Sequence, residues 1–330
     1  GTPVVSGKLE YSWTVQDYYF DRYTDEYFNF GADWYSCQYC GYGDEYIGSG
    51  KATLDISGQA KLSEVLDFEK LFKDGSGERS KIVVFHGTVK DLNGKSVSLQ
   101  KSFIVHRGDF YLGVKTDPSF SPVNQNITVR AKTVDVKGKP ISKNGIKLVA
   151  NKVEWKSAKR QEVDGGFYNQ YERILTPVSS ANISTNANGD GSASFSFKGP
   201  GEYQIKAFAK DSSGNEILGN SWVYVHGAGS ASVQPKNNET LDVVAEKTSL
   251  DVGENAKIII KSIYPRAKAL ITVERGRIFT YKVVSIDQNF FEFEVPITEE
   301  HVPNVQVSVL LLSPDPKIQF GQVMLDVNTA

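Results

Sequence analysis

The spacing of apolar side chains predicts β-strands along most of the chain. In the C-terminal part, residues 269–276 and 291–295 alternate between two faces with a period of two, residues 305–312 are largely apolar, and residues 258–260 are all isoleucine. Alternation is typical of a strand with one buried face, whereas a short apolar run suits a strand in a sandwich core. Turn residues separate these segments, so we expect a two-sheet antiparallel β domain here.

The N-terminal third shows the same pattern of strands and turns. We expect strands at residues 8–15, 50–58, 82–89 and 98–105. The last two would pair as a hairpin across the turn at residues 91–94, which ends in Asn-Gly. Residues 62–72 remain ambiguous, because their apolar side chains form a helical stripe that is also compatible with a strand.

An internal repeat organises the first two thirds of the chain. An Asp-x-x-Gly turn is followed by an alternating segment that ends in Val-His, and the whole pattern recurs after 120 positions. Asp91 and Gly94 return as Asp211 and Gly214, and His106 returns as His226. A repeat of this length corresponds to a whole domain.

The repeat and the composition divide the chain into three predicted domains. Residues 1–108 and 109–227 would be two copies of one β unit, and residues 240–330 a third β domain. Residues 228–239 are rich in small and polar side chains and are expected to be a linker. In the second copy, the polar residues 161–171 are expected to form a hairpin tip. The predicted fold class is all-β, with three tandem antiparallel β-sandwich domains of the immunoglobulin or fibronectin-III type.

Composition narrows the function classes. The 330 residues, 40% hydrophobic and 12% aromatic, can supply two or three packed cores. The net charge of −2 argues against nucleic acid or an anionic membrane surface as the main partner. No apolar segment approaches the roughly 20 residues that span a bilayer. Because the chain begins with Gly-Thr-Pro, we expect a processed chain or a piece of a longer polypeptide.

Several segments also resemble a known family. In the third domain these are residues 241–247, 252–256, 269–276 and 295–305. The most specific segment reads Pro-Ile-Thr-Glu-Glu-His-Val-Pro-Asn-Val, at residues 296–305. Together they resemble the macroglobulin domain that opens the bait-region part of bacterial α2-macroglobulins. In the second copy, residues 109–114, 135–140, 153–155 and 200–203 resemble macroglobulin domains of the same family, and the resemblance is weakest over residues 1–80.

The resemblance implies a non-enzymatic protease trap. In this family a protease cuts a bait segment, the domains rearrange, and the protease is enclosed or covalently held. The chain would be a scaffold of macroglobulin-like domains that frames bait and thioester domains lying outside it. Its implied partners are target proteases, reached through the full-length protein, and the neighbouring macroglobulin, bait and thioester domains. The implied location is the periplasm, the cell surface or the extracellular space.

The family's thioester is not expected in this chain. The thioester motif is Cys-Gly-Glu-Gln, and the single Cys-Gly pair here is Cys40-Gly41, which Tyr42 follows. No glutamine stands at the position of the acyl donor. The sequence therefore implies no catalytic residue and no cofactor.

The two cysteines, Cys37 and Cys40, have the spacing of a redox or half-zinc motif. Their Tyr, Gly and Asp neighbours indicate a loop rather than a helix start, and a zinc site would need two more ligands. Three interpretations stay open: a local disulfide, two free thiols, or a metal or redox function.

An aromatic segment surrounds these cysteines. Its candidate contact residues are Trp34, Tyr35, Tyr39 and Tyr42. Aromatic rings suit a sugar- or protein-binding surface, but they also suit a loop that packs over a sheet. The binding interpretation supports an alternative function, a cell-surface adhesin or carbohydrate-binding array of β-sandwiches.

Other candidate chemistry is weak. The four histidines, His86, His106, His226 and His301, lie at or near predicted strand ends, and we expect structural roles for them. Residues 186–191 imitate the start of a calcium-binding loop, but the twelfth position is Phe197 instead of glutamate. We therefore expect a plain turn and no metal site.

Overall fold

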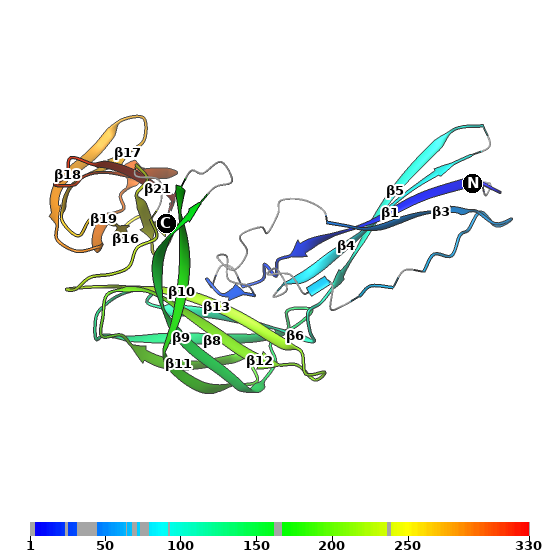
Figure 1. Cartoon of the computed structure of the whole chain (residues 1–330), viewed down its shortest axis with the longest axis horizontal. Helices are drawn as coiled ribbons and strands as arrows, with labels where there is room; N and C mark the ends of the chain where they lie inside the picture. Colours follow the sequence, from blue (N-terminus) through cyan, green and yellow to red (C-terminus); the bar gives the residue numbers. More distant parts are fainter. Residues whose placement is uncertain are drawn as a thin grey trace.

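The strands of this protein form four sheets, in which most neighbouring strands are antiparallel, and the sheets are arranged in three units. The computed structural model describes residues 4–23, 26–31, 45–63, 65–67, 71–72, 79–91, 93–161, 167–235 and 239–329. Nearly all regular structure in these residues is β, which confirms the predicted all-β class, although in the described residues the first unit has a single sheet where a sandwich was expected. Figure 1 shows the first unit as an arm on the right, the second below, and the third at the upper left.

The first unit is one four-stranded antiparallel sheet. Its strands are β1 (Lys8–Tyr18), β3 (Glu45–Thr53), β4 (Ser80–Lys90) and β5 (Ser96–Val105). They lie in the order β3-β1-β4-β5, so the predicted hairpin of β4 and β5 is confirmed. In the ambiguous segment 62–72, the described residues include a helical turn at residues 71–72, where the Leu71 N–H donates to the Asp67 carbonyl.

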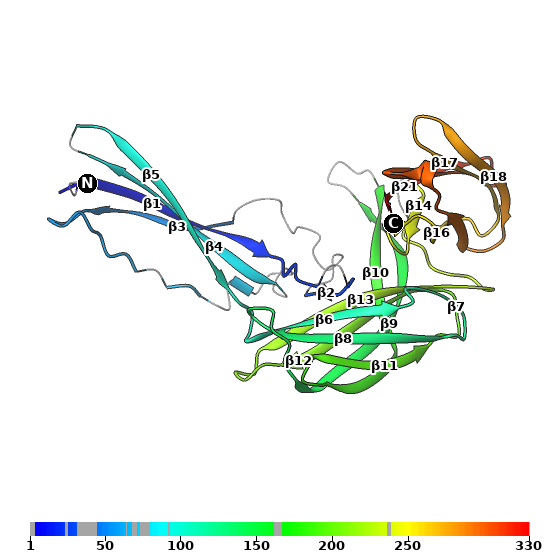
Figure 2. The same ribbon diagram turned by 180° about the vertical axis from the view of Figure 1, so that it is seen from behind.

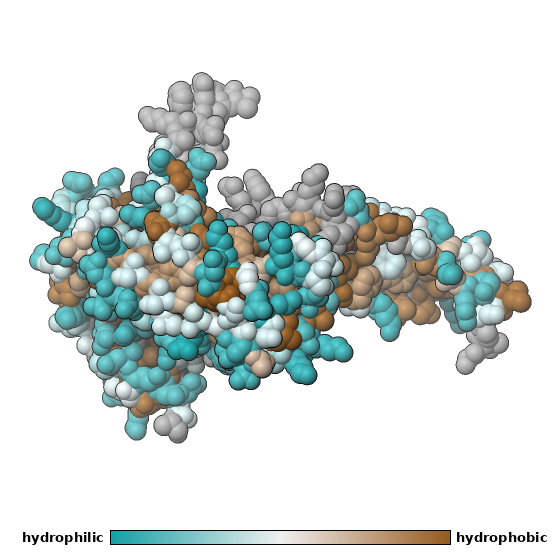
Figure 3. All heavy atoms as spheres, turned by 90° about the horizontal axis from the view of Figure 1, so that it is seen from below, coloured by the Kyte–Doolittle hydropathy of each residue, from teal (hydrophilic) through white to brown (hydrophobic). Residues whose placement is uncertain are grey.

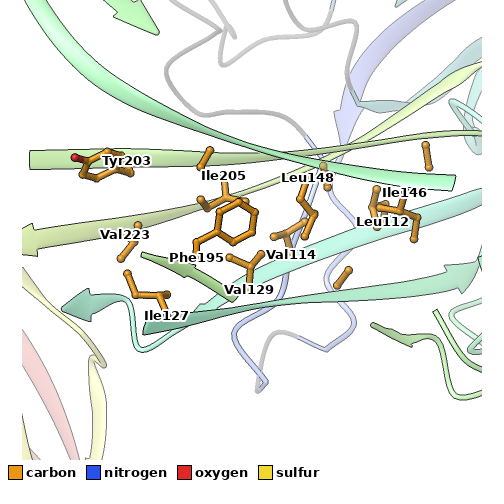
Figure 4. Packing of buried hydrophobic residues seen from close by; sticks show 14 of the residues in the cluster. Leu112, Val114, Ile127, Val129, Ile146, Leu148, Phe195, Tyr203, Ile205 and Val223 are labelled. Carbon is orange, nitrogen blue, oxygen red and sulfur yellow. The ribbon is translucent and has the colours of Figure 1, made fainter. Parts of the chain in front are cut away.

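The second unit is a nine-stranded sheet that folds over into two layers. Its strands are β6 (Phe110–Asp117), β7 (Phe120–Pro122), β8 (Asn126–Asp135), β9 (Lys143–Gln161), β10 (Phe167–Thr185), β11 (Asp190–Ser196), β12 (Gly201–Lys210) and β13 (Glu216–His226), with β2 (Asn29–Phe30). One layer follows the order β10-β9-β12-β13 and the other β6-β8-β11. Figure 4 shows apolar side chains of the two layers meeting, with Ile146, Leu148 and Ile205 on one side and Leu112 and Val129 on the other.

Strand β2 joins this sheet from the N-terminal third of the chain. Phe30 pairs with Gly113 of β6 and with Gly219 of β13, and so closes the gap between the layers. A side chain at Gly113 would lie 2.6 Å from the Phe30 ring, so the close approach of the two strands requires glycine there. Residues from the predicted first domain thus complete the sheet of the predicted second one.

The third unit is a sandwich of two sheets. Its strands are β14 (Asp242–Ala245), β15 (Ser249–Asp251), β16 (Asn255–Lys261), β17 (Ala267–Glu274), β18 (Ile278–Ile286), β19 (Phe290–Pro296), β20 (Asn304–Leu312) and β21 (Ile318–Asn328). The sheets have the orders β14-β16-β19 and β15-β21-β20-β17-β18. The four predicted strands are β16, β17, β19 and β20, and a buried core of aliphatic side chains lies between the sheets.

The long hairpin of β9 and β10 rises from the second unit beside the third (Figure 2). The backbone N–H of Trp155 on β9 donates to the Ser232 hydroxyl, in the segment that connects these two units. The predicted tip at residues 161–171 is shorter than expected, because β9 continues through Gln161 and β10 already begins at Phe167.

Candidate functional site

The second and third units meet at a small apolar cluster. Phe120 of β7, Ile259 of β16, Phe290 of β19 and Ala231 of the connecting segment are all buried in it. The Tyr224 ring lies 5.7 Å from the Phe120 ring and 6.3 Å from the Phe290 ring, measured between centroids. The predicted linker therefore packs into the junction.

A buried set of charges adjoins this cluster. The ammonium group of Lys261, at the end of β16, lies 3.6 Å from a Glu202 carboxylate oxygen and 3.4 Å from an Asp242 carboxylate oxygen. The Lys261 and Glu202 side chains are 5% and 6% exposed. The ammonium also lies 4.9 Å from the centre of the Tyr224 ring. Because an uncompensated buried charge is costly, Lys261 ties the second unit, through Glu202, to the third.

The ionisation of Glu202 depends on its burial and on the charges around it, to which Arg173 also contributes. Burial raises the pKa of Glu202 above its ordinary value of 4.5, the attraction of Lys261 opposes that rise, and Asp242 reinforces it. The protonated form of Glu202 is therefore favoured more in the folded protein than in water.

Three further polar contacts cross the junction. His226 Nε2 at the end of β13 lies 3.2 Å from a Glu292 carboxylate oxygen on β19, and the proximity of the His226 imidazole holds the pKa of Glu292 below its ordinary value. The Glu246 carboxylate accepts the N–H of Ser119 at 3.2 Å. The N–H of Ala231 donates to the Asn289 side-chain carbonyl at 3.1 Å. Contacts from several strands therefore join the two units.

Within the third unit, Arg275 organises a second polar site. Its guanidinium group donates to the backbone carbonyls of Glu300, His301, Val302 and Asn304. His301 is buried there, and its Nδ1 accepts the Thr298 N–H at 3.2 Å. The turn after β17 and the segment 296–305 are thus bound together, and these are two of the segments that carry the family resemblance.

The described residues contain neither a cluster of metal-binding side chains nor a membrane-spanning helix. No group of three or more His, Cys, Asp or Glu side chains in these residues is arranged to hold a metal ion. None of the described helices has the length and hydrophobicity that a membrane crossing requires.

The candidate residues of the aromatic segment lie outside the described residues. This holds for Cys37 and Cys40 and for the proposed contact residues Trp34, Tyr35, Tyr39 and Tyr42. The disulfide and the binding surface therefore stay predictions.

The described part of the aromatic segment packs against the second unit. Phe20 stacks on Tyr111 at 4.4 Å between ring centroids and contacts Phe30 at 4.8 Å. The Tyr23 hydroxyl donates to the Gly138 carbonyl at 2.9 Å. Phe20, Tyr23 and Phe30 thus take part in packing, whereas Tyr19 and Tyr27 are 55% and 52% exposed.

The histidines and the calcium-like loop have local partners. His86 lies 3.3 Å from the Thr14 hydroxyl, and His106 lies 2.7 Å from the Tyr111 hydroxyl. The side-chain oxygen of Asn186 accepts the N–H groups of Asn188 and Asp190, which makes residues 186–190 a turn as predicted.

Sequence reasoning missed the residues that make the junction. Lys261 ends a predicted strand and Glu202 follows a Gly-Pro-Gly turn, and neither position has a distinctive local pattern. One usable signal was present: Lys261 follows a continuous isoleucine run, where a charged side chain at the edge of a core needs a partner.

Comparison with known proteins agrees with the resemblance of the third unit. Residues 241–330 match the family described as the alpha-2-macroglobulin bait region domain. Among solved structures, the chain is similar to native Escherichia coli alpha-2-macroglobulin, at 14% identity and a TM-score of 0.48, over 99% of this chain and 21% of that one. It is also similar to Salmonella alpha-2-macroglobulin reacted with methylamine, at 14% identity and a TM-score of 0.49, again over 99% and 21%. The chain spans about a fifth of the length of these two proteins.

Proposed function

Because residues 241–330 belong to the alpha-2-macroglobulin bait region domain family, we propose that the chain is a scaffold segment of a bacterial protease inhibitor of the alpha-2-macroglobulin type. Members of this family are protease inhibitors and not enzymes. The chain itself performs no bond chemistry in this proposal. It positions a bait segment and a thioester domain that lie outside residues 1–330, in an exported protein of the periplasm or cell exterior.

The observation that carries the proposal is the family match of the third unit. The junction supports the scaffold role, because the buried pair of Lys261 and Glu202, with the half-buried Asp242 beside it, lies where the third unit meets the second. A bait can respond to cleavage in a defined way only if the domain that bears it has a defined orientation. Buried paired charges favour a single orientation of the two units, because separating either charge from its partner is costly.

The three units have separate parts in this proposal. Residues 240–330 begin the bait-region domain, residues 109–227 support it, and residues 1–108 extend the scaffold away from it. The Cys37–Cys40 pair is proposed as a local disulfide, which mass spectrometry of the unreduced protein would detect.

The function is tested with the full-length protein that contains this chain. Elastase is mixed with the protein, and its activity is measured on a small chromogenic peptide and on casein. The proposal predicts that peptide cleavage persists while casein cleavage is blocked, because an enclosed protease admits only small substrates. Loss of the block after methylamine pretreatment would identify a thioester in the full-length protein. Undiminished casein cleavage would overturn the proposal.

A further inference from the structure

The sheet of the first unit exposes an apolar face. On β5, Val97, Leu99 and Phe103 are 72%, 56% and 48% exposed. With Trp13 of β1 and Phe85 of β4 they line a hollow of about 820 Å³. Figure 3 shows hydrophobic surface along this arm of the molecule, at the right of the view. An apolar surface of this kind on a soluble protein marks a place where another element packs.

The second unit contains the same sheet with its face covered. The strand order β3-β1-β4-β5 in the first unit corresponds to β10-β9-β12-β13 in the second. The registers agree residue by residue: Trp13 pairs with Phe85 as Ala150 pairs with Ile205, and Tyr11 pairs with Gly87 as Leu148 pairs with Ala207. The offset is 137 positions for β1 and β9, and 120 for β4 and β12.

Equivalent positions in the two sheets differ sharply in burial. Val97 corresponds to Ile217, and their exposures are 72% and 4%. Phe103 corresponds to Val223, and their exposures are 48% and 0%. The face is buried in the second unit because the inward side chains of β6, β8 and β11 cover it.

The first unit has a segment equivalent to β11, which belongs to the layer that covers the sheet of the second unit. Residues 59–63 follow the turn at residues 55–58 as β11 follows the turn at residues 186–189. Strand β11 pairs with β8, whereas residues 59–63 belong to no strand pair among the described residues. Ala60 and Leu62 line the hollow, so this segment lies at the edge of the space where an equivalent of β8 would fit.

We propose that this face is a docking site for a layer of antiparallel β-strands of the β6–β8 kind, supplied by polypeptide outside residues 1–330. The incoming strands alternate apolar and polar side chains and pair with residues 59–63. Their inward side chains are smaller than those of β6 and β8, because Trp13, Phe85 and Phe103 stand where the second unit has Ala150, Ile205 and Val223. The layer enters beside Val4, which corresponds to Ile141, the residue that packs on the second core just after β8.

A second copy of this chain fits the face less well. Two copies would bring the Trp13, Phe85 and Phe103 rings of each sheet against the same rings of the other. Packed sheets lie about 10 Å apart, which leaves too little room for two layers of large aromatic side chains. A layer with small inward side chains does not have this conflict.

The test grafts residues 109–137 directly before Gly1, so that Lys137 is joined to Gly1 as it is to Gly138 in the second unit. A matched control graft carries serine at the inward positions Ile127, Val129 and Ala131 of β8. Hydrogen exchange of the β5 amides and binding of the dye ANS are measured for both grafts. We expect exchange at least ten-fold slower and dye fluorescence at least halved with the first graft, and no such change with the control.

The same two grafts are also joined to a variant of the first unit in which large aromatic side chains of the apolar face are replaced by smaller ones. In Trp13→Ala/Phe85→Ile/Phe103→Val these three positions take the side chains of the second unit, so the graft fits there without overpacking. If neither sheet gains protection from the apolar graft, or if both grafts act alike, the proposal is overturned. It is also overturned if the unmodified chain sediments as a dimer that Leu99→Asp converts to a monomer, since a second copy would then cover the face.

Discussion

At the scale of single residues, the most informative group is the carboxyl of Glu202. It is almost completely buried, and the Lys261 ammonium group lies near both it and Asp242. Burial raises the pKa of Glu202 despite the nearby Lys261. Because the folded pKa exceeds the unfolded value of 4.5, the stability that Glu202 contributes is fully present below pH 4.5 and is lost as the pH rises through the folded pKa.

Replacing Glu202 by glutamine tests this assignment. Glutamine imitates the protonated carboxyl, so Glu202→Gln should raise the free energy of unfolding at pH 8 and leave it unchanged near pH 4. Urea unfolding at the two pH values measures both effects. A variant that is less stable than the wild type at pH 8 would show that the attraction of Lys261 outweighs the cost of burial.

Arg275 shows how one side chain can order a segment. Its guanidinium group donates to four backbone carbonyls between residues 300 and 304. The planar fork of arginine can reach several acceptors at once, whereas lysine offers a single point of charge. Arg277 is close by in the sequence, but its nearest carboxylate, on Glu300, is 3.7 Å away and both side chains are about 70% exposed.

The two arginines therefore make a matched pair of substitutions. Arg275→Lys should lower the free energy of unfolding by about 1 kcal/mol through lost hydrogen bonds. Arg277→Lys should change it by less than about 0.5 kcal/mol, as expected for an exposed ion pair. Denaturant unfolding of both variants checks the difference. Equal effects would mean that the fork does not stabilise the segment.

At the scale of elements, a single turn design recurs along the chain. Asp91 and Asp211 each accept two backbone N–H groups, and a glycine with positive φ follows three residues later. The same arrangement occurs at Asn186, where Gly189 completes the turn. These turns were predictable, because Asx side chains and glycine at fixed spacing satisfy the backbone in this geometry.

Two of these glycines should respond differently to substitution. A methyl group at Gly189 would lie 2.3 Å from the Thr133 carbonyl oxygen, whereas Gly214 has open space around it. Both have positive φ, at 75° and 87°. Gly214→Ala should therefore cost about 1 kcal/mol of stability from backbone strain alone, and Gly189→Ala about 3 kcal/mol or more. Thermal unfolding compares them, and a smaller loss at Gly189 would contradict the packing described at this turn.

Strands with a clear alternation were predicted well, and short or fully exposed ones were not. The four strands expected in the third unit are present, but β18 and β21 were missed. Strand β18 carries Tyr281 and Val283 on its outward face, 70% and 60% exposed, so its apolar pattern does not separate an inner from an outer face. Strand β2 has two residues, and its place depends on Gly113 and Gly219 far along the chain.

At the scale of the whole molecule, the sequence indicated the units but not how they meet. The repeat and the family resemblance point to separate β units, because each is carried by local segments. The junction depends on Glu202, Lys261 and His226, which lie far apart in the chain and show no common pattern. A contact between distant single residues leaves no periodic signal, so only the structure brings these residues together.

The central claim is that the second unit holds the third in one orientation. Spin labels at Ser194 and Lys282, exposed on the second and third units, report the distance between them by pulsed electron resonance. We predict one narrow distance distribution, which broadens in Lys261→Met because the buried carboxylate of Glu202 then loses the Lys261 ammonium group. The control Lys51→Met, in an exposed pair with Glu10, should leave it narrow, and circular dichroism should show that both variants are folded. A broad distribution in the wild type, or an unchanged one in folded Lys261→Met, would contradict the account.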